Sequence, residues 1–230
     1  VHVDEPNEAI IFEDLSSSNY VMADRIDRLD LNHVQLNLTK LAKYHACAAI
    51  LNQRQPGIFS RYFDKGFCCH YDTGIDKMIK GNLAALCRLL EKTPDLRYKY
   101  NERLTKLQEN IMEYGRLAYD VNDEEFMTLT HGDFWTNNMM FKYAENEKGE
   151  KSVVNVNFVD FQFTSWGSPA LDLHYFFNTA LKEELQFEKQ PELLQFYHGI
   201  LSKTLQILDF KGHIPTLFEL RMQFEKRAIC

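Results

Sequence analysis

The middle of the chain constrains the fold most, because there the sequence changes from helical periodicity to strand chemistry. Residues 126–130 and 139–143 are short runs of β-prone residues. A charged turn over residues 144–151 contains Gly149, which can take the positive φ that a tight hairpin turn needs. An alternating run, residues 153–159, returns from that turn. The sequence therefore predicts a β-hairpin in the centre of the fold.

Helical periodicity dominates on both sides of this hairpin. Three stretches before it carry apolar residues at three- and four-residue steps. They are Val34, Leu38, Leu41, Ala42, His45 and Ala49; Ile75, Ile79, Leu83, Leu86 and Leu90, behind a cap at Thr73; and Leu104, Leu107, Ile111 and Tyr114. Helical character returns at Leu171, and Pro191 suits the first turn of a later helix. A capping box of Thr216 and Glu219 opens the last helix, which we expect to run to the end of the chain.

The chain begins with strand chemistry. Residues 1–3 and 9–12 read as two short strands, and residues 13–19 as a polar linker. Strands, helices, a hairpin and further helices in this order predict an α-rich α+β domain. A length of 230 residues suits one large domain.

Composition narrows the classes of partner. The formal charge is -7, from 26 Lys and Arg against 33 Asp and Glu, which disfavours nucleic-acid binding. No apolar run approaches the roughly 18 residues of a membrane helix. The start lacks the features of a signal peptide, and the odd count of 5 Cys indicates reduced thiols. We therefore expect a cytoplasmic protein with no membrane contact.

Two motifs carry the clearest chemical signal. Residues 131–138 read H-G-D-x-x-x-x-N, and residues 160–162, beyond the hairpin, read D-F-Q. Protein kinases have H-R-D-x-x-x-x-N and then D-F-G, which supply a catalytic base and two magnesium ligands. Either motif alone could be a turn with a helix-capping Asp, but the shared order and spacing favour a kinase-type site. They predict Asp133 as the base and Asn138 and Asp160 as ligands of Mg²⁺.

The hairpin explains how these side chains would meet. We expect Asp133 on a loop after one strand, and the next turn returns Asn138 to the same side. The returning strand then delivers Asp160 beside Asn138. Magnesium prefers oxygen ligands and keeps several waters, so two protein ligands and phosphate oxygens suffice.

The segment after Asp160 favours a small acceptor. Residues 163–169 alone separate the D-F-Q motif from the helical signal at Leu171, which leaves no room for a long activation segment. Gly132 stands where many protein kinases have an Arg that pairs with a phosphorylated activation loop. A small-molecule hydroxyl is therefore favoured over a protein side chain.

Neighbouring residues are assigned supporting or packing roles. We expect His131 to brace the loop, because the aspartate two residues later already acts as the base. Asp172 is expected to cap or brace the same loop. His45 lies on the apolar face of its helix and reads as a core histidine with satisfied hydrogen bonds. Phe134 and Trp135 fit a substrate pocket or the core equally well.

These residues resemble the ecdysteroid kinase-like family, also described as the choline-kinase-like or CHK domain of insects and related to aminoglycoside phosphotransferases. The resemblance covers nearly the whole chain, and the loop that contains Trp135 is a specific match. It rests on residues 11–15, 41–46, 131–138 and 159–162, with Asp172 beyond them. It implies ATP-dependent phosphorylation of steroid or other small-molecule hydroxyls.

The resemblance also implies an architecture, namely a two-lobed protein-kinase-like fold. Glu13, Asp14 and Leu15 would form the hinge that meets adenine through main-chain groups. Residues 1–18 would be the end of the N-terminal-lobe sheet with this hinge, and residues 19–230 an α-rich C-terminal lobe. The expected fold class is therefore α+β: mainly this C-terminal lobe, with a central β-hairpin and the last strands of the N-terminal lobe.

One departure leaves two hypotheses open. The family carries a phosphate-covering loop and a phosphate-binding Lys before its hinge, and residues 1–12 contain neither. The leading hypothesis is a monomeric kinase that uses ATP and Mg²⁺ on a small hydroxylated acceptor. A steroid is one candidate acceptor, and a choline- or sugar-type acceptor is less favoured. The alternative is a non-catalytic fragment or pseudokinase that binds a ligand or partner.

Overall fold

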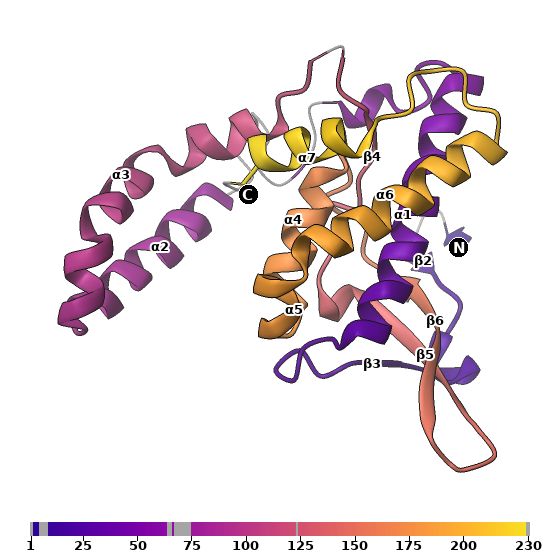
Figure 1. Cartoon of the computed structure of the whole chain (residues 1–230), viewed down its shortest axis with the longest axis horizontal. Helices are drawn as coiled ribbons and strands as arrows, with labels where there is room; N and C mark the ends of the chain where they lie inside the picture. The colour runs from indigo at the N-terminus through magenta and orange to yellow at the C-terminus, as the bar shows by residue number, and fades with distance from the viewer. Residues whose placement is uncertain (1, 5–8, 64–65, 67–74, 123, 229–230) are drawn as a thin grey trace.

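The computed structural model shows an α+β chain of several helices and small antiparallel sheets (Figure 1). It describes residues 2–4, 9–63, 66, 75–122 and 124–228. The helices are α1 (Leu31–Arg54), α2 (Ile75–Glu91), α3 (Pro94–Tyr119), α4 (Ala170–Thr179), α5 (Glu183–Glu188), α6 (Gln190–Ile207) and α7 (Leu217–Lys226). The strands are β1 (His2–Asp4), β2 (Ala9–Ile11), β3 (Tyr20–Met22), β4 (Thr128–Leu129), β5 (Met139–Glu145), β6 (Lys151–Phe158) and β7 (Trp166–Gly167).

The predicted central hairpin is confirmed. β5 and β6 pair antiparallel from Met139 opposite Phe158 to Glu145 opposite Lys151. Gly149 in the connecting turn has φ of 76°, the positive value that the sequence predicted. The two short strands expected at the start are also present, as the antiparallel pair β1 and β2.

β3 is a strand that the sequence did not predict. It has three residues and pairs antiparallel with β5, with Tyr20 opposite Lys142. The polar linker expected before it contains a 3-10 turn, Leu15–Ser18. So short a strand has no measurable periodicity, and its partner lies more than a hundred residues later in the chain.

α1 carries the predicted apolar face into the core. Its predicted apolar positions are all buried, among them Val34, Leu38 and Leu41. The Asp30 side chain caps the helix by accepting a hydrogen bond from the main-chain N–H of His33. α1 packs on α6 on one side and on the sheet on the other, so it forms the centre of the core.

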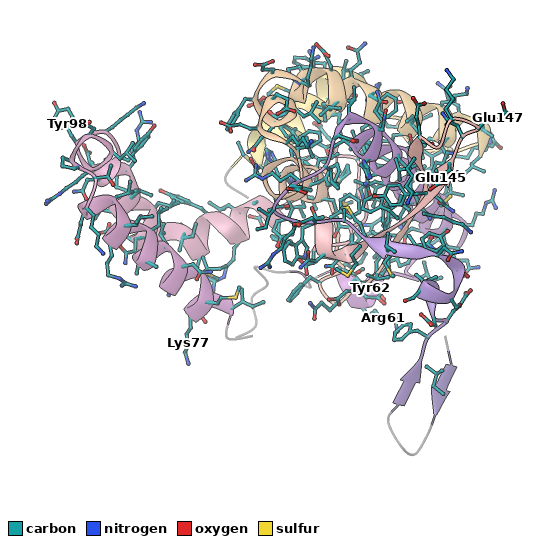
Figure 2. The ribbon with its side chains drawn as sticks, turned by 90° about the horizontal axis from the view of Figure 1, so that it is seen from below. Arg61, Tyr62, Lys77, Tyr98, Glu145 and Glu147 are labelled. Carbon is teal, nitrogen blue, oxygen red and sulfur yellow. The ribbon has the colours of Figure 1, made fainter. Side chains whose placement is uncertain are left out.

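α2 and α3 form an arm that projects from the rest of the molecule (Figure 1). Both helices were predicted, and most of their apolar side chains are exposed or half-buried. Within these described helices, Leu83 and Ala118 are the buried residues. Tyr98, near the tip of the arm, is 96% exposed (Figure 2). The predicted cap at Thr73 lies outside the described residues.

The last helix starts as predicted but ends earlier. The Thr216 and Glu219 capping box is present. α7 stops at Lys226, so the expectation that it runs to the end of the chain was wrong. The last turn tightens, because the N–H of Arg227 bonds to the Phe224 carbonyl at 3.0 Å.

Two further sequence expectations can be compared with the described part of the chain. Cys47 and Cys87 are free thiols there, whereas Cys68, Cys69 and Cys230 lie outside it. No described helix combines the length and apolar character needed to cross a membrane.

Candidate active site

The loop that carries Asp133 is held by strand pairing and by a glycine. β4 leads into it, and the N–H of Thr130 donates to the Ser165 carbonyl at 2.8 Å. Gly132 has φ of 85°, and a Cβ built there would lie 2.0 Å from the Phe163 carbonyl oxygen. The loop therefore needs glycine both for its backbone conformation and for its close approach to the opposite segment.

Asp133 and Asn138 are brought together as the spacing predicted. A 3-10 turn, Thr136–Asn138, reverses the chain between them. The Asn138 Nδ2 donates to the Asp133 main-chain oxygen at 2.8 Å and to its Oδ2 at 3.0 Å. Because both partners are acceptors, the nitrogen must occupy this side of the amide. The Asn138 Oδ1 is thereby turned away from Asp133.

Asp160 follows directly on the segment that pairs with Asn138. The N–H of Val159 donates to the Asn138 carbonyl at 3.0 Å. Asp160 itself has φ of 62°, which turns the chain sharply at this position. Its side chain is exposed, and Gln162 Nε2 donates to Oδ2 at 3.2 Å. Asn138 and Asp160 thus offer an amide and a carboxylate oxygen from adjoining segments, the donor types that magnesium prefers.

His131 connects these two segments. Its Nε2 lies 2.9 Å from the Val159 carbonyl oxygen, and its Nδ1 accepts from the Asp133 N–H at 3.3 Å. One donor and one acceptor describe a neutral imidazole with its proton on Nε2. Burial lowers the pKa of His131, against the opposing effect of the Asp172 charge. This geometry suits a brace between the loop and the Asp160 segment.

Asp172 holds the same loop from the first turn of α4. Its Oδ2 accepts from the N–H of His131 at 2.7 Å, and its Oδ1 accepts from the N–H of Gly132 at 2.8 Å. Burial alone would raise the pKa of Asp172, but the His45 hydrogen bond and charge and the loop amides hold it below its usual value. A buried carboxylate thus stays ionised where it binds the loop.

Tyr175 is a residue of the site that the sequence reasoning missed. Burial and the charge of the nearby Asp133 raise the pKa of the Tyr175 phenol, which places this phenol close to the Asp133 carboxylate. Tyr175 lies three residues after Asp172, about one helical turn along α4, so the two side chains share a helix face. This spacing was the available sequence signal.

The two aromatic residues of the loop have different surroundings. Phe134 is fully buried, with its ring 4.7 Å from that of Phe158 and 5.1 Å from that of Phe176. Its place is therefore in the core. Trp135 is half-buried.

The predicted adenine-binding hinge, residues 13–15, lies on a different segment, before β3. The Asp14 side chain accepts from the Ser16 N–H at 2.9 Å and caps the 3-10 turn. The main-chain carbonyl of Asp14 accepts a hydrogen bond from the Ser17 hydroxyl at 2.7 Å. Because β3 pairs with β5, this segment is attached to the strand that begins just after Asn138. Its role in nucleotide binding stays a prediction.

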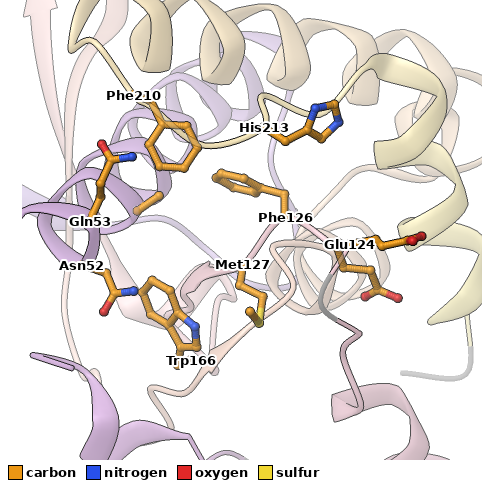
Figure 3. A pocket seen from close by; sticks show the side chains of 10 residues that line it. Asn52, Gln53, Glu124, Phe126, Met127, Trp166, Phe210 and His213 are labelled. Carbon is orange, nitrogen blue, oxygen red and sulfur yellow. The ribbon is translucent and has the colours of Figure 1, made fainter. Parts of the chain in front are cut away.

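A separate cavity of about 270 Å³ opens beside β4 (Figure 3). Its walls combine the aromatic rings of Phe126, Trp166 and Phe210 with polar side chains such as Asn52 near the end of α1. None of Asp133, Asn138 or Asp160 lines it. No pattern in the sequence predicted this cavity.

A comparison with known families matches residues 1–210 to the ecdysteroid kinase-like family. The chain belongs to that family. The match spans both motifs, the hairpin, and the helices from α1 to α6, and α7 lies beyond it. A comparison with curated proteins finds no match.

Family membership implies a kinase-like phosphotransferase and, in general, the use of ATP. The described residues contain no group of three or more His, Cys, Asp or Glu side chains placed to hold a metal ion. The predicted magnesium ligands are of another kind, one carboxylate and one amide, which rely on phosphate oxygens to complete the shell. The free Oδ1 of Asn138 and the exposed carboxylate of Asp160 fit such a role.

Proposed function

We propose that this member of the ecdysteroid kinase-like family transfers the γ-phosphoryl group of ATP to a hydroxyl of a small molecule. In this proposal the fold is protein-kinase-like, with residues 1–18 as the end of an N-terminal-lobe sheet and hinge. Residues 19–230 form the α-rich C-terminal lobe. The family match supports the phosphotransferase class, and the arrangement around Asp133 supports the chemistry.

Asp133 acts as the base in the proposed reaction. Its Oδ2 accepts a hydrogen bond from the Asn138 amide, whose nitrogen also donates to the Asp133 main-chain oxygen. A carboxylate held by this amide keeps one orientation toward an incoming alcohol, and positioning is most of the catalysis in phosphoryl transfer. As the new O–P bond forms and the bond to ADP breaks, the hydroxyl proton passes to Asp133.

Asn138 and Asp160 hold the nucleotide's metal ion in the proposal. Bound Mg²⁺ would supply charge neutralisation at the phosphates. On the protein side, the Asp133 contacts fix the Asn138 amide so that Oδ1 remains available. Residues 13–15 are proposed to meet adenine through main-chain groups.

The acceptor is proposed to be a small hydroxylated molecule, with steroids as the first candidates from the family's name. The support is the short connection after Asp160, because α4 already begins at Ala170. So short a segment offers no extended platform for a protein substrate.

The observation that carries the proposal is the paired hydrogen bond between Asn138 and Asp133. The test is Asp133→Asn in the 230-residue chain, assayed with Mg-ATP and a panel of hydroxylated small molecules that includes steroids. We expect phosphorylated product, measured by mass spectrometry, to fall by about 10²- to 10⁴-fold, the contribution of a general base.

Asp24→Asn is the matched control. Asp24 is exposed and accepts the Ile26 N–H, a bond that an Asn side chain can also accept. Its activity should equal that of the unsubstituted chain. Undiminished phosphorylation of every accepted substrate by Asp133→Asn would remove Asp133 from the role of base.

A further inference from the structure

A continuous chain of buried side chains lies behind the catalytic loop. The Tyr197 hydroxyl of α6 is 2.6 Å from Nδ1 of His45 on α1. The Nε2 of His45 is 3.0 Å from Oδ2 of Asp172 on α4. Tyr197 and His45 are 0% exposed and Asp172 is 1% exposed. Three helices therefore meet through polar groups in the core. Asp172 connects them to the loop, because it accepts hydrogen bonds from two loop amides.

The hydrogen-bond pattern assigns the proton on His45. The Asp172 carboxylate already accepts two main-chain N–H groups and is an acceptor only, so the nitrogen facing it must donate. The Nε2 of His45 therefore carries the proton. The Nδ1 faces the Tyr197 hydroxyl at 2.6 Å, a group that can donate to a ring nitrogen or accept from it. Both ring nitrogens of His45 thus have a hydrogen-bond partner, as a buried polar network requires.

His45 also holds the strand that leads into the loop. The Thr128 hydroxyl, at the start of β4, donates to the His45 main-chain oxygen at 2.7 Å. The same residue thus fixes the loop from behind through Asp172 and fixes its entry through Thr128. The position of His45 is therefore coupled to the loop by two contacts, one through its side chain and one through its main-chain oxygen.

We propose that His45 is the positioning residue of the catalytic loop. Its Nε2–H keeps both oxygens of Asp172 directed at the amides of His131 and Gly132, and this fixes where the following Asp133 lies. This inference rests on the proposed function, because the loop is catalytic only if Asp133 acts as the base. The effect on the loop itself can be measured without any substrate.

His174 provides the comparison for a merely structural histidine. It is buried on α4, and its Nε2 lies 2.6 Å from the Phe224 carbonyl oxygen. Its ring stacks on that of Phe224 at 3.7 Å. Its hydrogen bond goes to α7, on the other side of α4 from the loop contacts of Asp172. Replacing it should lower stability without moving the loop.

The first test uses the unsubstituted chain and NMR of its histidine nitrogens. Long-range proton–nitrogen spectra should show a proton on Nε2 of His45. A proton found on Nδ1 alone would overturn the proposal, because Nε2 could then not donate to Asp172.

The second test compares His45→Leu, His45→Gln and His174→Leu by the amide signals of His131 and Gly132. Amide protons bonded to a carboxylate should resonate at high frequency. We expect His45→Leu to lose this shift and His45→Gln to retain it, since Gln has an N–H donor for Asp172 and a carbonyl acceptor for Tyr197. His174→Leu should leave both signals in place. Unchanged loop amides in His45→Leu would overturn the proposal.

Tyr197→Phe covers the case in which His45→Leu does not fold. It removes one hydroxyl and keeps the ring, and the same two amide signals should shift in the same direction by a smaller amount. Unchanged signals in this variant would also contradict the coupling.

In an activity assay, His45→Leu should lose about 10²-fold in kcat, the scale of a misplacement of about 1 Å. His45→Gln should recover most of that loss, and a kcat unaffected by His45→Leu would contradict the positioning role. The two proposals fail separately. Full activity of Asp133→Asn would end the proposed base role while the amide shifts still tested the positioning of the loop.

Discussion

Gly132 shows at the scale of one residue why the loop has its shape. It combines a positive φ with a main-chain neighbour so close that no side chain fits. Gly149 in the hairpin turn also has a positive φ, but nothing lies within 4 Å of a Cβ built there. A substitution at Gly149 would therefore introduce backbone strain alone, whereas one at Gly132 would introduce backbone strain and steric overlap.

Gly132→Ala should destabilise the protein far more than Gly149→Ala. A non-glycine residue in the left-handed region costs roughly 1–2 kcal/mol, and this is the expected loss at position 149. At position 132 the clash with the Phe163 carbonyl adds to that cost, because main chain must move. Urea unfolding of both variants measures the difference. Equal losses would mean that the loop relaxes around the added methyl group.

The buried histidines make the stability of the molecule depend on pH. Burial lowers the pKa of His131 and of His174 from the usual 6.5. The unfolded chain then binds protons that the folded chain does not, so their contribution to stability is complete above pH 6.5 and declines as the pH falls below it.

His174→Gln should reduce this dependence. The free energy of unfolding is measured in urea at pH 7.5 and at pH 5.5, for the unsubstituted chain and for the variant. We expect the unsubstituted chain to lose more stability on acidification, because the variant lacks one group that protonates on unfolding. Identical losses would show that His174 takes up its proton equally well in the folded state.

Elements differ in how well their sequences predicted them. The α1 face and the α7 start follow local rules, periodicity and capping, and both were correct. The apolar stripes of α2 and α3 were read correctly as helical, and the structure leaves most of them exposed or half-buried. These two helices pack mainly on each other, and one helix cannot cover the whole stripe of its neighbour. Burial depends on what lies opposite, which periodicity does not state.

The candidate site divides in the same way. The turn that joins Asp133 to Asn138 connects positions five apart, and this spacing alone predicted it. The contact of His45 with Asp172 joins positions 127 residues apart, and no local sequence pattern predicts it. β3 was missed for the same reason. Short-range geometry was therefore available from the sequence, whereas contacts made by tertiary packing were not.

The capping box of α7 offers a prediction at the scale of one element. Thr216→Ala removes the side chain that accepts the Glu219 N–H at 3.2 Å. Losses of about 1 kcal/mol are typical of such a change. Thr216→Ser keeps the hydroxyl and should stay close to the unsubstituted chain in urea unfolding. If both variants lose the same amount, the cap contributes little and packing alone holds this helix.

The whole molecule consists of a packed body and the arm of α2 and α3, and one side chain secures their junction. Arg227, fully buried after α7, donates to the main-chain oxygens of Ala118 at 2.9 Å and of Asp120 at 2.8 Å. It also bonds to Glu125. The end of α3 and the segment that returns from it are thereby attached to the last helix of the body.

Arg227→Met should therefore loosen the arm at its base. The change leaves buried carbonyl groups without their donor and removes one of the two cations at Glu125, and breaking a buried pair costs about 3–5 kcal/mol. Lys226→Met is the matched control, since Lys226 bonds to the same carboxylate from the surface at 2.6 Å and should cost less than about 1 kcal/mol. Hydrogen exchange should speed up in the last turn of α3 in Arg227→Met and not in Lys226→Met. Unaltered exchange there would mean that the arm is held by contacts other than the guanidinium.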